Sequence, residues 1–146
     1  MKKKLLKIGI ILFGIGLLSA FGVYMYVFHK PHRNVEAEKP AFIINASDLF
    51  NEYSTNEEGG KTKFQNKVLQ VTGSIAEVTI GEDEATIVLV DATSGISCAM
   101  DSLVAVQMKD KIKTLKVGEN ITLKGKCDGF DAIMGVVLTK CYFIDN

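Results

Sequence analysis

The feature that most constrains this chain is an uncharged, apolar run near its N-terminus. Residues 8–28 read IGIILFGIGLLSAFGVYMYVF, which is 21 residues without Asp, Glu, Lys, Arg or His. An α-helix of this length can cross the hydrocarbon core of a bilayer, which is about 30 Å thick. We therefore predict one transmembrane helix at residues 8–28, through which the chain has a membrane as its partner.

The residues on each side of this run predict its orientation. Four lysines precede it within residues 1–7, and segments rich in Lys and Arg stay on the cytoplasmic side. Tyr24 and Tyr26 lie near the other end, where aromatic side chains favour the membrane interface. We expect a single-pass membrane protein in which residues 1–7 form a cytoplasmic tip and the C-terminal domain is extracytoplasmic.

A cleaved signal peptide is the alternative interpretation of the same run. Its apolar core is usually about 7 to 15 residues long and ends at small residues. Ala20 and Gly22 are the best-placed small pair, but cleavage there would leave the apolar sequence VYMYVF at the new N-terminus. No cysteine precedes Cys98, which excludes a lipid-modified N-terminal cysteine. We favour the uncleaved anchor.

Beyond the apolar run, we expect a linker at residues 29–44 and one domain at residues 45–146. The linker is polar and contains Pro31 and Pro40. The chain has a formal charge of zero, but residues 1–40 sum to +5 and residues 41–146 to −5. An acidic domain disfavours a nucleic-acid partner, because binding to phosphates depends on Lys and Arg.

Hydrophobic periodicity predicts the order helix, three strands, helix, two strands. An amphipathic helix begins near Asn45, and Gly59-Gly60 should weaken or end it. After Lys67 apolar residues recur with a period of two, and turn residues separate the elements. The expected strands are residues 68–78, 85–90, 96–100, 120–128 and 135–144, with a helix between residues 101 and 118.

This order is that of the OB-fold, a five-stranded barrel with a helix between strands three and four. Gly73 and Gly125 lie in the first and fourth strands, where a small barrel needs its strands to bend. We therefore predict a mainly β fold class: an OB-fold-like five-stranded barrel, helix-β-β-β-α-β-β, after the N-terminal transmembrane helix.

The domain also resembles the tRNA_anti-like family of small exported OB-fold proteins. The resemblance covers about Ala46 to Ile144 and is carried by ASDLFNEYSTNEEGG, KVLQVTGSIAEV, ISCAM, VGENITLKGKCDGF and VVLTKCYF. It implies the OB-fold and an extracytoplasmic location. The sequence departs from the family pattern at Gly59-Gly60, where a family member usually continues its helix.

The reactive side chains of the domain do not form a catalytic pattern. His29 and His32 both lie in the linker, so the domain has no imidazole to activate a serine or cysteine nucleophile. Residues 82–84 are three adjacent carboxylates in a turn, where like charges are usually solvated. We expect no enzyme, no catalytic residue, no cofactor and no metal site.

The three cysteines have no spacing typical of a zinc site. Cys127 and Cys141 fall in the last two strands, which a hairpin should make neighbours. Outside the cytoplasm a disulfide is permitted, so Cys127 and Cys141 are the disulfide candidates and Cys98 would be an odd, buried thiol. Alternatively, all three are small buried hydrophobic residues.

These observations favour a non-enzymatic binding or assembly module of unknown ligand, with a protein, peptide or glycan as its partner. Single-stranded nucleic acid is the alternative ligand, because OB-folds often stack bases on aromatic side chains of strands two and three. Residues 85–100 contain no Phe, Tyr or Trp. The sequence therefore makes nucleic-acid binding the weaker hypothesis.

Overall fold

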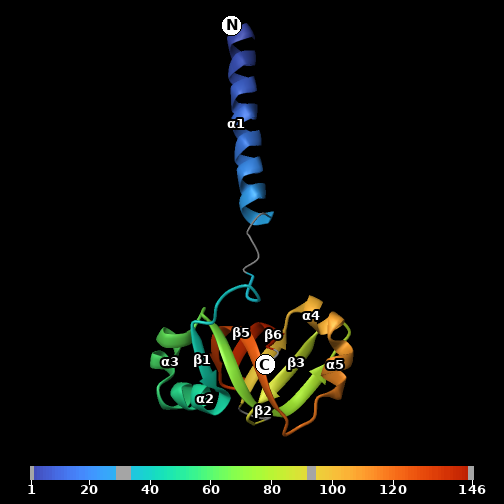
Figure 1. The fold of residues 1–146 in the computed structure, drawn as a ribbon. Coiled ribbons are helices and arrows are strands. Elements are labelled where there is room, and N and C mark those ends of the chain that lie inside the picture. Colours follow the sequence, from blue (N-terminus) through green and yellow to red (C-terminus); the bar gives the residue numbers. More distant parts are fainter. Residues whose placement is uncertain (1, 29–33, 92–94, 145–146) are drawn as a thin grey trace. The chain divides into compact units, whose positions relative to one another are not determined.

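A computed structural model of the chain describes residues 2–28, 34–91 and 95–144 (Figure 1). The chain divides into two compact units, residues 1–33 and 34–146. The first contains helix α1, Lys2–Phe28. Within the part of the chain that the structure describes, no helix is long and apolar enough to cross a membrane. The second unit contains every other helix and strand.

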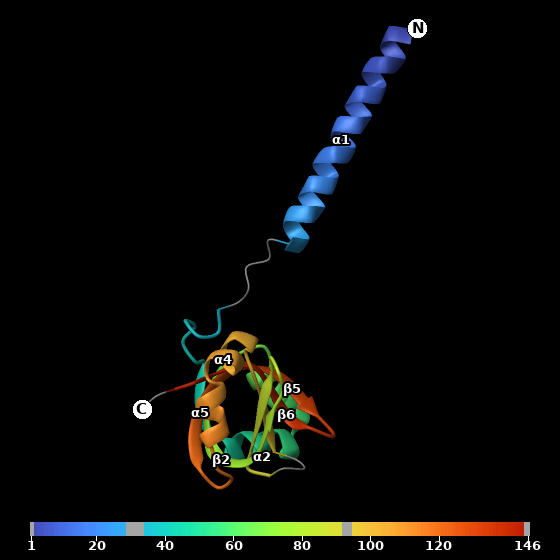
Figure 2. The same cartoon turned by 90° about the vertical axis from the view of Figure 1, so that its right-hand side faces the viewer.

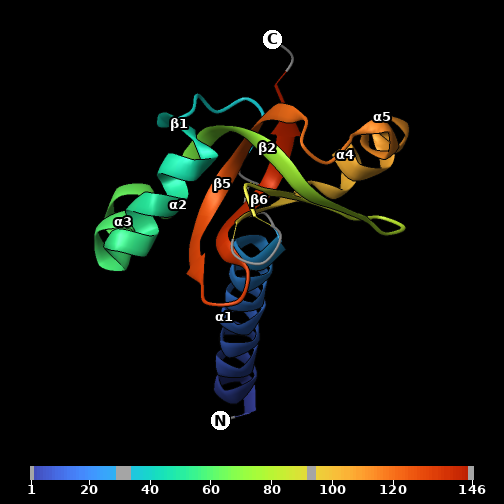
Figure 3. The ribbon, with the colours of Figure 1, turned by 90° about the horizontal axis from the view of Figure 1, so that it is seen from below.

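The second unit is built on a closed barrel of five strands, as the sequence predicts. The strands are β2 (Val68–Ile80), β3 (Ala85–Leu89), β4 (Ile96–Met100), β5 (Asn120–Asp131) and β6 (Gly135–Phe143). They follow the order β2-β3-β4-β6-β5, and β5 pairs back with β2 to close the barrel (Figure 3). The β4–β6 pair is parallel, whereas the other barrel pairs are antiparallel. This arrangement is that of an OB-fold.

Strand β2 closes the barrel because its two halves pair with different neighbours. Its first half, residues 68–74, pairs with β5, and its second half, residues 75–80, pairs with β3. Gly73 lies just before this change of partner. A Cβ atom at Gly73 would lie 2.6 Å from the Cβ of Ala46, so glycine is what allows the helix that begins at Ala46 to pack against the strand here.

One strand was not predicted from the sequence. Strand β1, Phe42–Asn45, pairs in parallel with Leu69–Thr72 of β2. The linker predicted at residues 29–44 is therefore wrong at its C-terminal end, because residues 42–44 belong to the sheet. Its first residues, 29–33, lie outside the described part of the chain, whereas Val35 is fully buried.

Each predicted helix of the domain is a pair of short helices. The first pair is α2 (Ala46–Thr55) and α3 (Glu57–Phe64), and the second is α4 (Ser102–Gln107) and α5 (Lys109–Thr114). The pairs lie on opposite sides of the barrel (Figures 1 and 3). Figure 2 shows the side on which α5 packs along β2.

The expectation that Gly59-Gly60 ends the first helix is wrong, because the helix is interrupted earlier, at Asn56. The Asn56 side chain caps α3 by accepting a hydrogen bond from the Gly59 backbone N–H at 2.9 Å. A Cβ atom at Gly60 would lie 2.8 Å from the Tyr53 ring. Both glycines therefore lie inside α3, and Gly60 makes room for a buried aromatic side chain.

The core fills the barrel and the seam beneath α2 and α3. Every second residue of β3 and β4 points inward and is buried. Three large side chains from the helices, Leu49, Tyr53 and Phe64, are at most 1% exposed. Ile112 of α5 is buried from the other side of the barrel. At about 25 cal/mol per Å² of apolar surface, this burial is the main favourable contribution to folding.

A buried lysine fastens the segment before β1 to the barrel. Lys124 of β5 is only 8% exposed, and its ammonium donates hydrogen bonds to the carbonyl oxygens of Glu36 and Glu38. The backbone N–H of Ala41 donates to Val68 of β2 at 2.7 Å. These contacts order residues 35–41 against the barrel.

Replacing Lys124 with Met should loosen residues 35–41, because Met has a side chain of similar length but no ammonium group. We expect the free energy of unfolding to fall by about 1 to 2 kcal/mol, because hydrogen bonds from a charged donor are lost. Amide hydrogen exchange should become faster at residues 35–41. Lys116→Met, at an exposed position, is the matched control. Unchanged exchange at residues 35–41 in the Lys124 variant would contradict this account.

Candidate functional site

The outer surface of β3 and β4 carries small, uncharged side chains. The residues that alternate with the buried ones are Thr86, Val88, Ser97 and Ala99, and all four are half-buried. Val137 of β6 pairs with Ser97 and continues the surface. We call these five residues the neutral face. It lies on the strands that commonly bind ligands in OB-folds.

Two turns of different character lie at opposite ends of the neutral face. At one end, the β2–β3 turn exposes Glu82, Asp83 and Glu84. At the other end, the β5–β6 turn exposes Ile133 and Met134, whose exposed fractions are 82% and 52%. The neutral face is thus bordered by negative charge on one side and by exposed apolar side chains on the other.

A carboxylate shapes the β5–β6 turn. Asp131 accepts hydrogen bonds at Oδ1 from the backbone N–H groups of Ile133 and Met134, at 2.8 and 3.0 Å. The N–H groups of Met134 and Ile133 lower the pKa of Asp131, because they stabilise its charged form. The ionised carboxylate therefore holds the turn in the conformation that exposes both apolar side chains.

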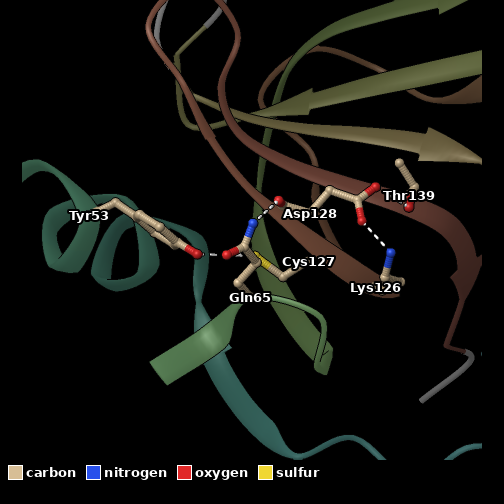
Figure 4. Close-up of polar contacts among 6 residues, drawn as sticks. All are labelled: Tyr53, Gln65, Lys126, Cys127, Asp128 and Thr139. Carbon is tan, nitrogen blue, oxygen red and sulfur yellow. Dashed lines mark hydrogen bonds and ion pairs between the residues drawn. The ribbon is translucent and has the colours of Figure 1, made fainter. Parts of the chain in front are cut away.

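A polar cluster of Lys126, Asp128 and Thr139 lies on the outer surface of β5 and β6 (Figure 4). Lys126 forms an ion pair with Asp128, and the Thr139 hydroxyl donates to the other carboxylate oxygen at 2.7 Å. Burial alone would raise the pKa of Asp128. The hydrogen bonds from Lys126 and Thr139, together with nearby positive charge, outweigh burial and lower it.

Beside this cluster, side chains from α2 and the α3–β2 connection contact β5. The Tyr53 hydroxyl lies 3.4 Å from the Cys127 sulfur, and the Gln65 amide donates to the Asp128 carbonyl at 3.0 Å (Figure 4). Burial, followed by the contact with Cys127, raises the pKa of Tyr53. These contacts join the helical pair to the barrel, and they leave Tyr53 as a neutral hydroxyl.

All three cysteines are free, buried thiols. The structure therefore does not support the disulfide predicted between Cys127 and Cys141. Strands β5 and β6 do pair, but their register places Cys127 opposite Leu138, while Cys141 lies beyond an irregularity near Lys124 and Lys126. Burial raises the pKa of Cys127 and of Cys141, so both remain protonated at neutral pH and are poor nucleophiles.

Two shallow grooves lie near the start of β5, and they share Thr72 and Asn120. One is about 330 Å³ and includes Phe143, whose ring is covered by the Lys111 ammonium at 4.8 Å. The other is about 390 Å³ and is lined mainly by polar side chains and backbone, including Asn45 and Ser74. The first groove is also lined by Glu119 and Thr122.

No group of three potential metal-ligating side chains occurs among the residues that the structure describes. Carboxylates are present, but Asp128 is paired with Lys126, and Asp131 is used by the turn.

Sequence reasoning located the strands of the neutral face but missed two parts of the site. The sequence did not predict that Ile133 and Met134 are exposed, since apolar residues before a strand usually continue into the strand. The polar cluster gave a partial signal: Lys126 and Asp128 are two residues apart and so share a strand face. Thr139 could not be added without the register of β6.

Comparisons with known proteins agree on the family and the fold. A family model described as tRNA_anti-like matches residues 1–143. A crystal structure of a "putative nucleic acid-binding lipoprotein" from Klebsiella pneumoniae subsp. pneumoniae MGH 78578 is 12% identical, with a TM-score of 0.55. The match covers 80% of this chain and 100% of the Klebsiella chain. At this identity the likeness shows the fold alone.

Two further structures are less similar. The S. pombe Stn1-Ten1 complex has a TM-score of 0.39 at 15% identity, covering 54% of this chain and 59% of the other. The OBody AM3L15 bound to hen egg-white lysozyme has a TM-score of 0.42 at 10% identity, and the match covers 56% of this chain and 84% of the OBody chain. No curated protein matches the chain.

The polar cluster should make stability depend on pH. Because the pKa of Asp128 is lowered on folding, its contribution is present above the unfolded pKa of about 3.9 and is lost as pH falls through the folded value. Asp128→Asn should lower the free energy of unfolding by about 1 kcal/mol at neutral pH. In urea unfolding, this difference from the wild type should shrink below about pH 4.

Asp110→Asn is the control, because Asp110 is fully exposed and only weakly paired with Lys113 at 3.8 Å. Its difference from the wild type should be small at every pH. A deficit of Asp128→Asn that is the same at acidic and neutral pH would show that the carboxylate charge does not provide the stabilisation.

Proposed function

The chain belongs to the tRNA_anti-like family, and from this premise we propose that it is a membrane-anchored, non-enzymatic binding or assembly module. Its OB-fold domain lies outside the cytoplasm and binds a protein or peptide segment through the neutral face. The observation that carries the proposal is this face of small, uncharged side chains, bordered by the exposed Ile133 and Met134.

The composition of α1 supports the membrane anchor. Its described side chains from Phe13 to Tyr26 include no charge, and most of the large apolar ones are more than half exposed. Phe13 and Leu18, for example, are 71% and 74% exposed. In water this would be an unusually large apolar surface, whereas lipid would cover it on all sides. The lysines at its N-terminus favour a cytoplasmic start and an extracytoplasmic domain.

The shape and chemistry of the neutral face support a protein or peptide partner. Small side chains leave the backbone of β3 and β4 accessible to close packing, and the apolar turn adds surface that is favourable to bury. An interface needs such an apolar centre with polar residues around it. The acidic turn, Glu82 to Glu84, would favour a partner with basic residues at that end.

Nucleic acid remains the alternative ligand, because the fold often binds it. The neutral face has no aromatic side chain on which a base could stack and no Lys or Arg for phosphates. The charge of residues 41–146 is −5, which repels a polyanion. A glycan partner is also less favoured, since the face offers few hydrogen-bonding side chains.

Photo-cross-linking in intact cells tests the binding face. A benzophenone amino acid at Ala99, on the neutral face, should give a covalent adduct with a protein partner. The same group at Lys61, an exposed position on α3, should not. Adducts at both positions, or at neither, would contradict the proposal.

A charge on the apolar turn should weaken the same interaction. Ile133→Asp places a charge in an exposed position, so we expect a melting temperature within a few degrees of the wild type. The adduct from position 99 should fall several-fold, because burying an unpaired carboxylate in an interface is unfavourable. An undiminished adduct would exclude Ile133 from the interface.

The anchor predicts a distinct fractionation. The full chain should stay with membranes after alkaline carbonate extraction, and protease added to spheroplasts should digest the domain from residue 34 onward. A cleaved leader would instead yield a shorter chain that appears in the soluble fraction. Protection of the domain until the membrane is lysed would contradict the proposed orientation.

A further inference from the structure

A row of short polar side chains crosses three neighbouring strands, β1, β2 and β5. Asn45, the last residue of β1, is in register with Thr72 of β2, which is in register with Thr122 of β5. Residues in register on neighbouring strands project from the same face of a sheet. Two residues along, Ser74 of β2 pairs with Asn120 of β5 and extends the row on that face. We call these five residues the polar row.

The polar row lines the two grooves near the start of β5, which share Thr72 and Asn120. Their volumes of about 330 and 390 Å³ each fall within the range of about 300 to 1,000 Å³ that is typical of small-molecule sites. Among the residues that the structure describes, no charged side chain lines the larger groove, and one of each sign, Lys111 and Glu119, lines the smaller. The charges therefore favour an uncharged ligand over a phosphate, a carboxylate or a cation.

The side chains of the polar row can both donate and accept hydrogen bonds. The hydroxyls of Thr72 and Thr122 lie 2.9 Å apart, and one of them donates to the other. The accepting hydroxyl keeps its own proton, so the pair can still donate a hydrogen bond to a ligand. Asn120 is exposed, and its amide offers an N–H donor and a carbonyl acceptor. The row therefore suits a ligand that is rich in neutral groups of both kinds.

Each groove also includes an apolar side chain. Val90 lines the larger groove and is 39% exposed. Its φ of 78° is rare for a β-branched residue, and such conformations persist only where the surroundings impose them. Here the Val90 N–H donates to the Ser74 carbonyl at 2.9 Å, which fixes the backbone of Val90 beside the polar row. In the smaller groove, the half-buried Phe143 supplies the apolar surface.

We propose that the two grooves form a binding site for a short, uncharged carbohydrate chain. A sugar carries hydroxyls on most of its carbons, whereas a peptide offers one N–H and one C=O per residue. The density of hydroxyls and amides in the polar row matches the sugar more closely. The C–H surface of a sugar ring is apolar, so Val90 and Phe143 are surfaces on which it is favourable to bury.

This site is separate from the neutral face. No lining residue of either groove belongs to the neutral face, within the part of the chain that the structure describes. The neutral face offers few hydrogen-bonding side chains, which disfavours a glycan there, while the polar row consists of nothing else. The domain thus has one surface suited to a protein and another suited to a carbohydrate.

Chemical-shift mapping tests the site. The full chain, labelled with ¹⁵N in phosphatidylcholine nanodiscs, is titrated with maltotriose, cellotriose and chitotriose, which are uncharged trisaccharides. Nanodiscs replace sugar-based detergents, because such detergents would compete for the grooves. We expect at least one trisaccharide to bind saturably, with the largest shifts at the backbone amides of residues 72–74, 90 and 120–122. Saturable binding by none of them, or shifts concentrated on the neutral face, would overturn the proposal.

Substitutions in the polar row should weaken that binding. Asn120→Ala removes an exposed amide that both grooves share, so we expect the dissociation constant to rise about fivefold, as for one lost hydrogen bond. Asn51→Ala, at an exposed position on α2, is the matched control and should bind as the wild type does. Ser74→Ala replaces Asn120→Ala if that variant fails to fold. Equal weakening by Asn51→Ala, or wild-type affinity in the polar-row variant, would overturn the proposal.

Two further probes test the class of ligand. Trigalacturonic acid, an anionic trisaccharide, should bind more weakly than the uncharged one. A Gly-Ser-Gly peptide with both ends blocked should give no saturable shifts in the grooves. Tighter binding of either probe would overturn the assignment to an uncharged carbohydrate. Because all these measurements use the purified chain, their results do not depend on the protein partner proposed for the neutral face.

Discussion

The pairing of β2 with two barrel neighbours is the constraint on which the rest of the domain depends. Its first half bonds to β5 and its second half to β3, so one strand closes the sheet on itself. Closure removes the free edges of the barrel strands that would otherwise pair with other chains. It also fixes the register that brings Lys124 beneath residues 36–38 and positions Asp128 beside Thr139. The short strand β1 pairs with β2 and is an edge strand of the sheet.

Closure also determines which surface is free to bind. The helices α2 and α3 cover one side of the barrel and α4 and α5 the opposite side (Figure 1). The outward-facing residues of β3 and β4 are half-buried, so part of each side chain remains exposed to solvent. Their uncharged side chains give a surface that costs little to dehydrate. The same fold can therefore bind different classes of ligand when its surface differs, and we propose that this surface binds a protein rather than a polyanion.

Local patterns in the sequence were enough to predict the barrel strands, and they failed where the structure depends on distant contacts. The period of two identified β4 at Ile96–Met100 with the observed bounds. Strand β1 was missed because four residues give little periodicity and their parallel partner lies far along the chain. Gly59-Gly60 suggested a helix end, yet Tyr53 requires Gly60 inside α3. The structure does not support the predicted cysteine pair for the same reason: hairpin neighbours were expected, but the register of β5 and β6 is irregular there, and Lys140 has a φ of 51°.

Direct retention of nucleic acid by the full chain in lipid nanodiscs tests the central claim, that the neutral face is suited to a protein and not to a polyanion. Labelled single-stranded RNA and DNA would be titrated at low and at moderate salt and collected on filters with the nanodiscs. Because electrostatic binding is strongest at low salt, the account predicts no saturable retention even there, above that of empty nanodiscs. Saturable retention that survives moderate salt and is lost when Ser97 is replaced by Glu would contradict it.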